Sequence, residues 1–154
     1  MSISQVVQEN MVMALSTAMH HYQIPVSTPT LNEHLRSHPD YPALKAIKET
    51  LDYFNIENHP LRISSTELTE IDEPFLALTQ LPNEELQFVH CSEKDASFVL
   101  MNSQKLRKVS RTEFSQFFSG AVIFLRPNQQ SGDKEYKAQK KLSILRKFLV
   151  VAGS

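Results

Sequence analysis

The sequence predicts an α+β fold in which helices come first and an antiparallel sheet follows. In the first third of the chain, apolar residues recur at steps of three and four, a pattern typical of helices packed through one face. After residue 56 the pattern changes to short runs rich in β-branched and aromatic residues, separated by turn-forming residues. The 154 residues are 41% hydrophobic and 21% charged, which predicts a single globular domain with a sizeable core.

Three helices are expected in the N-terminal half. The first spans residues 10–22, where an apolar stripe follows one helical face. The second opens on Thr28-Pro29, an N-cap followed by proline at the first helical position, and stops near residue 37. The third starts near residue 40 or 41, and Asn55 is a suitable left-handed stop.

Strands dominate the second half, and two short helices interrupt them. Ser64 to Glu67 and Ser110 to Glu113 each have the spacing of a capping box, and Gly120 is suited to ending the second of these helices. Strands are predicted over residues 56–63, 75–81, 86–92, 97–103 and 121–126. The four strands from residue 75 to residue 126 suggest an antiparallel meander, with the second short helix before its last strand.

The composition changes near residue 127. We therefore predict a domain over residues 1–127, followed over residues 128–154 by a linker and a basic amphipathic tail. Basic residues just before an apolar run are typical of the cytoplasmic flank of a membrane segment, so the tail is interpreted as the start of one. The alternative is an amphipathic helix whose Leu142 and Leu145 pack on the domain or form a homodimer with a second copy.

Three short motifs lie at the ends of predicted elements. Glu9-Asn10-Met11 precedes His21-Tyr22-Gln23 by about one dozen residues, Gln87-Phe88-Val89-His90 begins a strand, and Asn102-Ser103 ends the next. They resemble the Asp-Cys-Gly, His-Phe-Val-Val and Asp-Pro motifs of peptidase family C-39, the bacteriocin-processing cysteine peptidases. The stretch from Glu113-Phe114 to Pro127 is similar to the end of that domain.

The resemblance implies a papain-like fold in which the catalytic residues are replaced. Asn10 stands in the place of the nucleophilic cysteine, Gln87 in that of the general base, and Asn102 in that of the orienting carboxylate. Cysteine-protease chemistry needs a thiolate, an imidazole to activate it and a group that orients the imidazole. We therefore expect a catalytically inactive domain whose former cleft, with Asn10, Met11, Gln87 and Asn102, binds a peptide or an unfolded segment.

The segment from His38-Pro39 to Leu44 points to a particular group within this family. It is similar to C-39-like domains that precede vitamin K epoxide reductase and thioredoxin-type modules, and the degenerate domain at the front of peptide-exporting ABC transporters is a second precedent. Both imply an attached transmembrane module that this domain regulates, on the cytoplasmic side of a bacterial membrane.

Two other functions remain open at the level of sequence. The first is an active C-39 peptidase with Cys91 as a displaced nucleophile, although His90 cannot serve as its base because neighbouring strand residues point to opposite faces. The second is a structural or dimerisation domain.

Composition argues against several further classes. The net charge of −1 gives no reason to expect a nucleic-acid partner. A single cysteine rules out an internal disulfide and fits a reducing compartment. His34 and His38 have a chelating spacing, but Pro39 interrupts the helix there, so neither a metal nor another cofactor is predicted.

Overall fold

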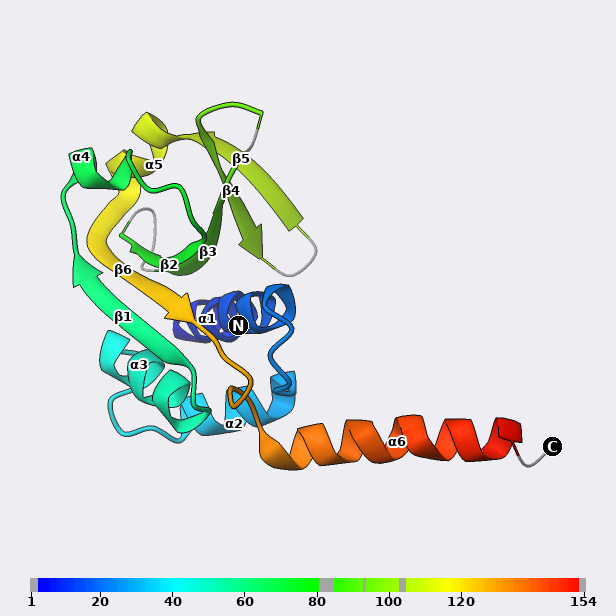
Figure 1. The fold of residues 1–154 in the computed structure, drawn as a ribbon. Helices are drawn as coiled ribbons and strands as arrows, with labels where there is room; N and C mark the ends of the chain where they lie inside the picture. The colour runs from blue at the N-terminus through cyan, green and yellow to red at the C-terminus, as the bar shows by residue number, and fades with distance from the viewer. Residues whose placement is uncertain (1–2, 81–84, 93, 103–104, 153–154) are drawn as a thin grey trace.

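The computed structural model describes residues 3–80, 85–92, 94–102 and 105–152, and it confirms the α+β class (Figure 1). The helices are α1 (Ile3–His21), α2 (Thr28–Arg36), α3 (Leu44–Tyr53), α4 (Ser65–Leu68), α5 (Arg111–Phe117) and α6 (Lys134–Ala152). The strands are β1 (Glu57–Arg62), β2 (Phe75–Thr79), β3 (Glu85–Cys91), β4 (Ser97–Asn102), β5 (Lys105–Ser110) and β6 (Phe118–Arg126).

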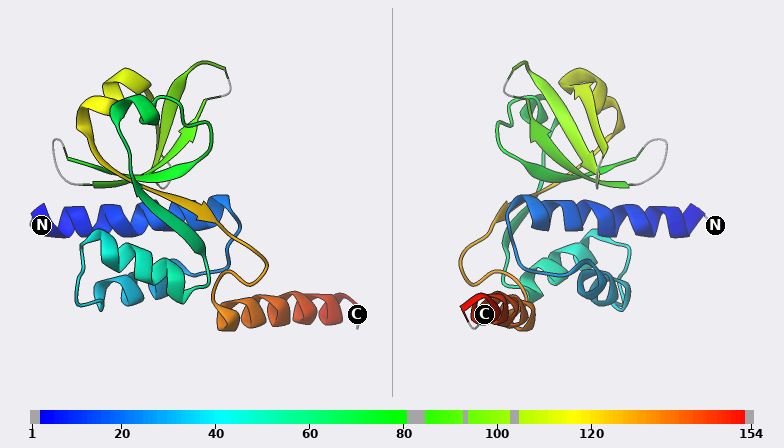
Figure 2. Two further views of the ribbon diagram at one scale, coloured as in Figure 1. Left: turned by 60° about the vertical axis from the view of Figure 1, so that its left-hand side comes forward. Right: turned by 90° about the vertical axis from the view of Figure 1, so that its right-hand side faces the viewer.

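One six-stranded antiparallel sheet has the order β1-β6-β2-β3-β4-β5. The predicted meander is therefore confirmed from β2 to β4 and continues into β5, but the prediction that the strand near residues 121–126 completes it was wrong. β6 returns to pair with β2, and β1 pairs with β6 at one edge. α1 lies between the sheet and the pair formed by α2 and α3 in both views of Figure 2. This arrangement places the first helix in the middle of the molecule.

Buried side chains form two clusters on the two faces of the sheet. The helix-side cluster joins α1, α2 and α3 to residues such as Leu76, Leu86 and Phe88 of the sheet. The aromatic cluster lies on the opposite face, under α4 and α5, and contains Phe75, Phe98 and Phe114. Strand alternation separates the two sets, because successive residues of a strand point to opposite faces.

Local chemistry explains where several elements begin and end. The Ser27 side chain accepts a hydrogen bond from the Thr30 amide, so the N-cap of α2 lies one residue before the expected Thr28. The capping box at Ser64 is confirmed, with bonds in both directions between Ser64 and Glu67. Asn55 has a φ of 58°, which confirms the left-handed stop after α3.

Three predicted boundaries were wrong, and one strand was not predicted. α1 begins at Ile3 rather than at residue 10, and α3 begins at Leu44 rather than at 40 or 41. β5 was not predicted, because its sequence is mostly polar and lies at the edge of the sheet. Gly120 does not end α5: the helix stops at Phe117, and the glycine, with a φ of 100°, lies inside β6.

The segment between β6 and α6, expected to be a linker, is held against the body. The buried Ser131 donates its hydroxyl to the Asn55 carbonyl at 2.8 Å, and the Gly132 amide donates to the Phe54 carbonyl at 2.7 Å. The Asp133 amide donates to the Pro25 carbonyl at 2.9 Å. The start of α6 is therefore fixed, while the rest of the helix projects away from the body (Figure 1). Within the described residues, no helix is long and apolar enough to cross a membrane.

Candidate functional site

Asn10 and Met11 lie on α1, and the helix begins well before them. In the family that the sequence resembles, the nucleophile begins this helix. Here α1 starts at Ile3, so Asn10 is more than one turn inside it. A thiolate gains stabilisation from a helix dipole only in the first turn, so this position lacks that support. Met11 is buried, with 1% of its surface exposed, and belongs to the helix-side cluster.

Gln87 and Asn102 lie on neighbouring strands. Phe88 of β3 pairs with Met101 of β4, so the same antiparallel register continued by one residue sets Gln87 opposite Asn102. Both positions are at the strand ends nearest the β4–β5 turn, and α1 contacts β3 and β4. The sheet thus brings together the two positions that the sequence motifs assign to the base and the carboxylate.

Gln87 is half-buried, and its side chain already has a partner. Its amide nitrogen donates to a carboxylate oxygen of Glu85 at 3.0 Å. Alternation places Gln87 on the face of Val89, whereas Phe88 points to the helix-side cluster under α1. Gln87 therefore points away from α1, toward the face that carries the aromatic cluster, and the sheet does not direct its side chain toward the helix of Asn10.

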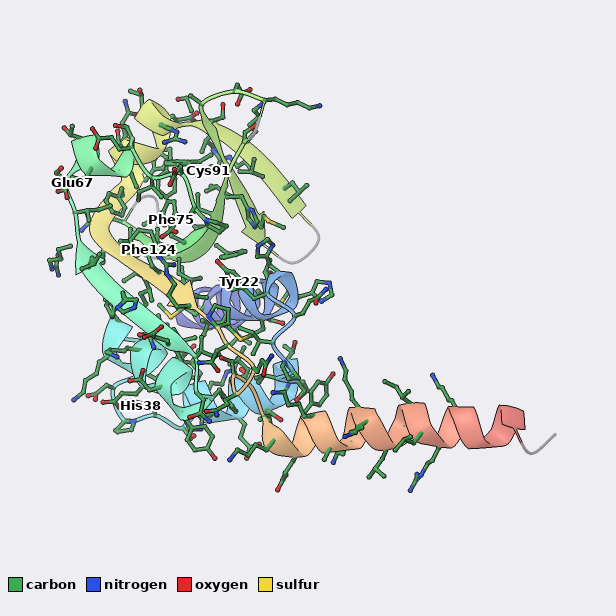
Figure 3. All side chains as sticks on the ribbon, viewed as in Figure 1. Tyr22, His38, Glu67, Phe75, Cys91 and Phe124 are labelled. Atoms are coloured by element: carbon green, nitrogen blue, oxygen red, sulfur yellow. The ribbon has the colours of Figure 1, made fainter. Side chains whose placement is uncertain are left out.

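Cys91 and His90 point to opposite faces of the sheet, as predicted. The Cys91 thiol lies 3.2 Å from the Ile71 carbonyl oxygen and is associated with the aromatic cluster. Burial raises the pKa of this thiol, an effect that the nearby Arg111 only partly offsets. The site thus favours the protonated, unreactive form of the sulfur. Cys91 and the Tyr22 side chain lie on opposite sides of the sheet (Figure 3).

His90 takes part in a ring contact that was not predicted from the sequence. Its ring centroid is 4.3 Å from that of His21, at the end of α1, and 4.9 Å from that of Phe88. His90 Nε2 is buried without a hydrogen-bond partner among the described residues. Burial and the neighbouring His21 lower the pKa of His90, and burial lowers that of His21. This contact joins α1 to β3, and the lowered pKa values favour the neutral form of both imidazoles.

His34 and His38 have separate partners. The His34 ring stacks on Tyr53 with the centroids 4.2 Å apart, whereas His38 Nε2 contacts the Glu49 carboxylate. Among the described residues, no group of three or more histidine, cysteine, aspartate or glutamate side chains could hold a metal ion.

A surface pocket of about 580 Å³ lies at the other end of α1. Its walls come from α1, the segment that precedes α2, and Tyr136 and Lys140 of α6. Met11 and Gln87 line neither this pocket nor the other two described pockets, which border the segment before α6. These pockets are therefore distinct from the predicted cleft.

A central helix packed against an antiparallel sheet defines the class as a papain-like peptidase fold. The model of the Peptidase C39 family matches residues 2–130, so the chain belongs to the peptidase C39 family. No curated protein matches the chain by sequence.

Solved structures share the fold at low identity. The peptidase domain of Streptococcus ComA, a bifunctional ABC transporter of a quorum-sensing pathway, has a TM-score of 0.63 and 18% identity, covering 82% of this chain and 96% of that one. A double-glycine motif protease from an AMS/PCAT transporter, solved with its leader peptide, has a TM-score of 0.66 and 13% identity, covering 79% and 86%. The N-terminal peptidase C39-like domain of a toxin-secretion ATP-binding protein from Vibrio parahaemolyticus has a TM-score of 0.54 and 10% identity, covering 79% and 97%.

Proposed function

We propose that this chain is a catalytically inactive C39 domain that binds a peptide or an unfolded segment. The observation that carries the proposal is the replacement of all three reactive positions by Asn10, Gln87 and Asn102 in a chain that belongs to the family. A carboxamide neither shuttles a proton nor acts as a nucleophile at neutral pH, so the three positions together supply none of the required chemistry.

Two features of the site support the loss of catalysis. The helical start at Ile3 leaves position 10 without a free helix N-terminus to stabilise a thiolate. The Gln87 amide is bonded to Glu85, and a histidine placed there would have this carboxylate as a neighbour in addition to residue 102. The surroundings of the replaced residues thus differ from those that a working dyad needs.

The proposed binding surface is the predicted cleft of Asn10, Met11, Gln87 and Asn102. Because Met11 is buried and Gln87 points to the face of the sheet away from α1, we expect a ligand to contact mainly the ends of β3 and β4. The solved double-glycine protease holds a leader peptide, which makes peptide the first ligand class to test. We further propose that the domain spans residues 1–127, that residues 128–154 connect it to a transmembrane module, and that it regulates this module from the cytoplasmic side of a bacterial membrane. The family's place in transporters supports this arrangement.

Peptide cleavage tests the inactive state. We expect no product, by mass spectrometry, when the protein is incubated with double-glycine leader peptides. The single variant Asn10→Cys and the triple variant Asn10→Cys, Gln87→His, Asn102→Asp are expected to remain inactive, because α1 does not begin at position 10. Turnover by the unmodified protein would end the proposal, and alkylation of Cys91 would then show whether that thiol is responsible.

Peptide binding is tested separately by amide chemical shifts. Titration with a leader peptide is expected to move signals from α1 and from the ends of β3 and β4. Gln87→Ala should weaken binding, whereas Gln129→Ala, an exposed glutamine before α6, is the matched control. Shifts confined to other surfaces, or no shifts with any peptide, would leave a structural domain as the better description.

A further inference from the structure

The charges of this chain are divided between its body and α6. Helix α6 contains six basic residues and one acidic residue, Glu135, whereas the rest of the chain contains ten basic and sixteen acidic residues. The net charge of −1 therefore conceals a positive helix attached to a negative body. None of the ion pairs between described residues involves α6.

Exposed apolar side chains accompany these basic residues. Leu142, Ile144 and Leu145 are 53%, 64% and 51% exposed, and they form half of the exposed large apolar residues described. All residues from Lys137 to Lys147 are exposed. A helix that presents both charge and apolar surface gains from a partner that accepts both.

The geometry leaves this helix accessible. The segment that contains Ser131 and Gly132 fixes the start of α6 to the body, and the remainder extends away from it (Figure 1). The acidic body can therefore remain at a distance while α6 contacts another surface. The separation matters because an anionic partner would repel the body within a Debye length of about 8 to 10 Å.

We propose that α6 binds the surface of an anionic phospholipid bilayer, with its basic residues against the headgroups and with Leu142 and Leu145, which share one side of the helix, in the boundary with the acyl chains. Basic residues are attracted to anionic lipid surfaces, and apolar side chains between them strengthen the attachment. This proposal concerns a surface outside the peptide cleft and does not depend on the proposed function.

Charge complementarity favours a bilayer over a second copy. Leu142 and Leu145 are three residues apart and share one side of the helix, with Lys141 and Arg146 beside them. Pairing this side with its copy would bring basic residues together, and like charges oppose such pairing. Nucleic acid would neutralise the charges but would gain nothing from burying leucine.

Vesicle sedimentation of the full chain tests the proposal. The protein should bind vesicles of phosphatidylglycerol and phosphatidylcholine but not vesicles of phosphatidylcholine alone, and raising the salt from about 0.1 M to about 0.5 M should release it. Lys140→Glu combined with Lys141→Glu should weaken partitioning at least about tenfold. The matched control, Lys94→Glu with Arg107→Glu, makes the same charge change on the body. It should change the partitioning onto anionic vesicles by less than about twofold.

The apolar contribution is tested with Leu142→Ser combined with Leu145→Ser. This variant should also bind anionic vesicles less tightly, while its unfolding midpoint stays unchanged because both residues are exposed. Equal binding to neutral vesicles, or none to anionic ones, overturns the proposal. The proposal is also overturned if sedimentation equilibrium shows that the unmodified protein is a dimer and that this variant is a monomer. Binding to duplex DNA that is tighter than binding to anionic vesicles would overturn it as well. Amide chemical-shift changes at the cleft on addition of peptide are a separate measurement. The failure of one proposal would therefore leave the other standing.

Discussion

The two faces of the sheet bury different chemistry. The aromatic cluster joins Phe75, Phe98 and Phe114 by edge-on ring contacts, and Arg111 lies over the Phe98 ring at 4.6 Å. The helix-side cluster is mostly aliphatic, and the titratable rings of His21 and His90 lie at its margin. Of the predicted cleft residues whose side chains the structure describes, Met11 belongs to the helix-side cluster and Gln87 to neither cluster. The side chains that hold this fold together are therefore mainly apolar residues outside the positions that the sequence motifs assign to catalysis.

The largest expected effect tests whether the aromatic face is as important as the helix side. Phe98→Ala should lower the free energy of unfolding by about 3 to 5 kcal/mol, because it removes a fully buried ring and leaves a cavity. Phe88→Ala is the counterpart on the helix side, and Leu106→Ala, at an exposed position, is the control. Urea unfolding measures all three. A loss below about 1 kcal/mol for Phe98→Ala would mean that the aromatic face contributes little.

A smaller loss of stability is expected from a change in the segment between β6 and α6, which lies outside both clusters. Gly132 has a φ of 118°, and a Cβ there would lie 2.8 Å from two ring carbons of Pro25. Gly132→Ala should therefore cost about 1 to 3 kcal/mol and loosen the attachment of α6. Thermal unfolding gives the cost, and hydrogen exchange of the Asp133 amide reports the loosening. Gln129→Ala in the same segment should change neither; if the glycine variant matches it, the close approach to Pro25 is unimportant.

The capping box of α4, which covers the aromatic cluster, is expected to make a modest contribution to stability. Ser64→Ala should destabilise by about 1 kcal/mol, because the Glu67 amide loses its acceptor. Ser65→Ala, one residue later, is the control and should be nearly neutral. Equal stability of the two variants in urea would show that the cap makes no net contribution.

The smallest expected effect is a dependence on pH that belongs to the helix side alone. Because the pKa values of His21 and His90 are lowered in the folded state, the unfolded chain binds protons more readily below pH 6.5. Stability should be fully present above that pH and should decrease as the pH falls from about 7 to about 5. His90→Phe should flatten this slope, whereas Phe98→Leu on the other face should leave it in place. If the free energy of unfolding of the His90 variant depends on pH as it does in the unmodified protein, other titrating groups cause the dependence.

The sequence predicted the fold class and most elements because apolar periodicity and caps are local signals. It missed the first turns of α1, although Ile3, Val6 and Val7 extend the helical spacing. It missed β5 because an exposed edge strand carries little apolar pattern. The motifs suggested the positions of Asn10, Gln87 and Asn102, and the backbone register, continued by one residue beyond the Phe88–Met101 pair, sets the last two positions opposite each other. The Gln87–Glu85 bond and the His21–His90 contact depend on side-chain directions that spacing does not determine.

Both outer strands of the sheet resist the addition of another strand. At one edge, Pro60 in β1 has no amide hydrogen to donate. At the other edge, β5 carries the exposed Arg107 and Lys108, and charges of this kind oppose edge-to-edge association. An extended ligand therefore gains little from main-chain pairing with this sheet. Its recognition has to depend on side-chain contacts, and the same edges protect the domain from aggregation.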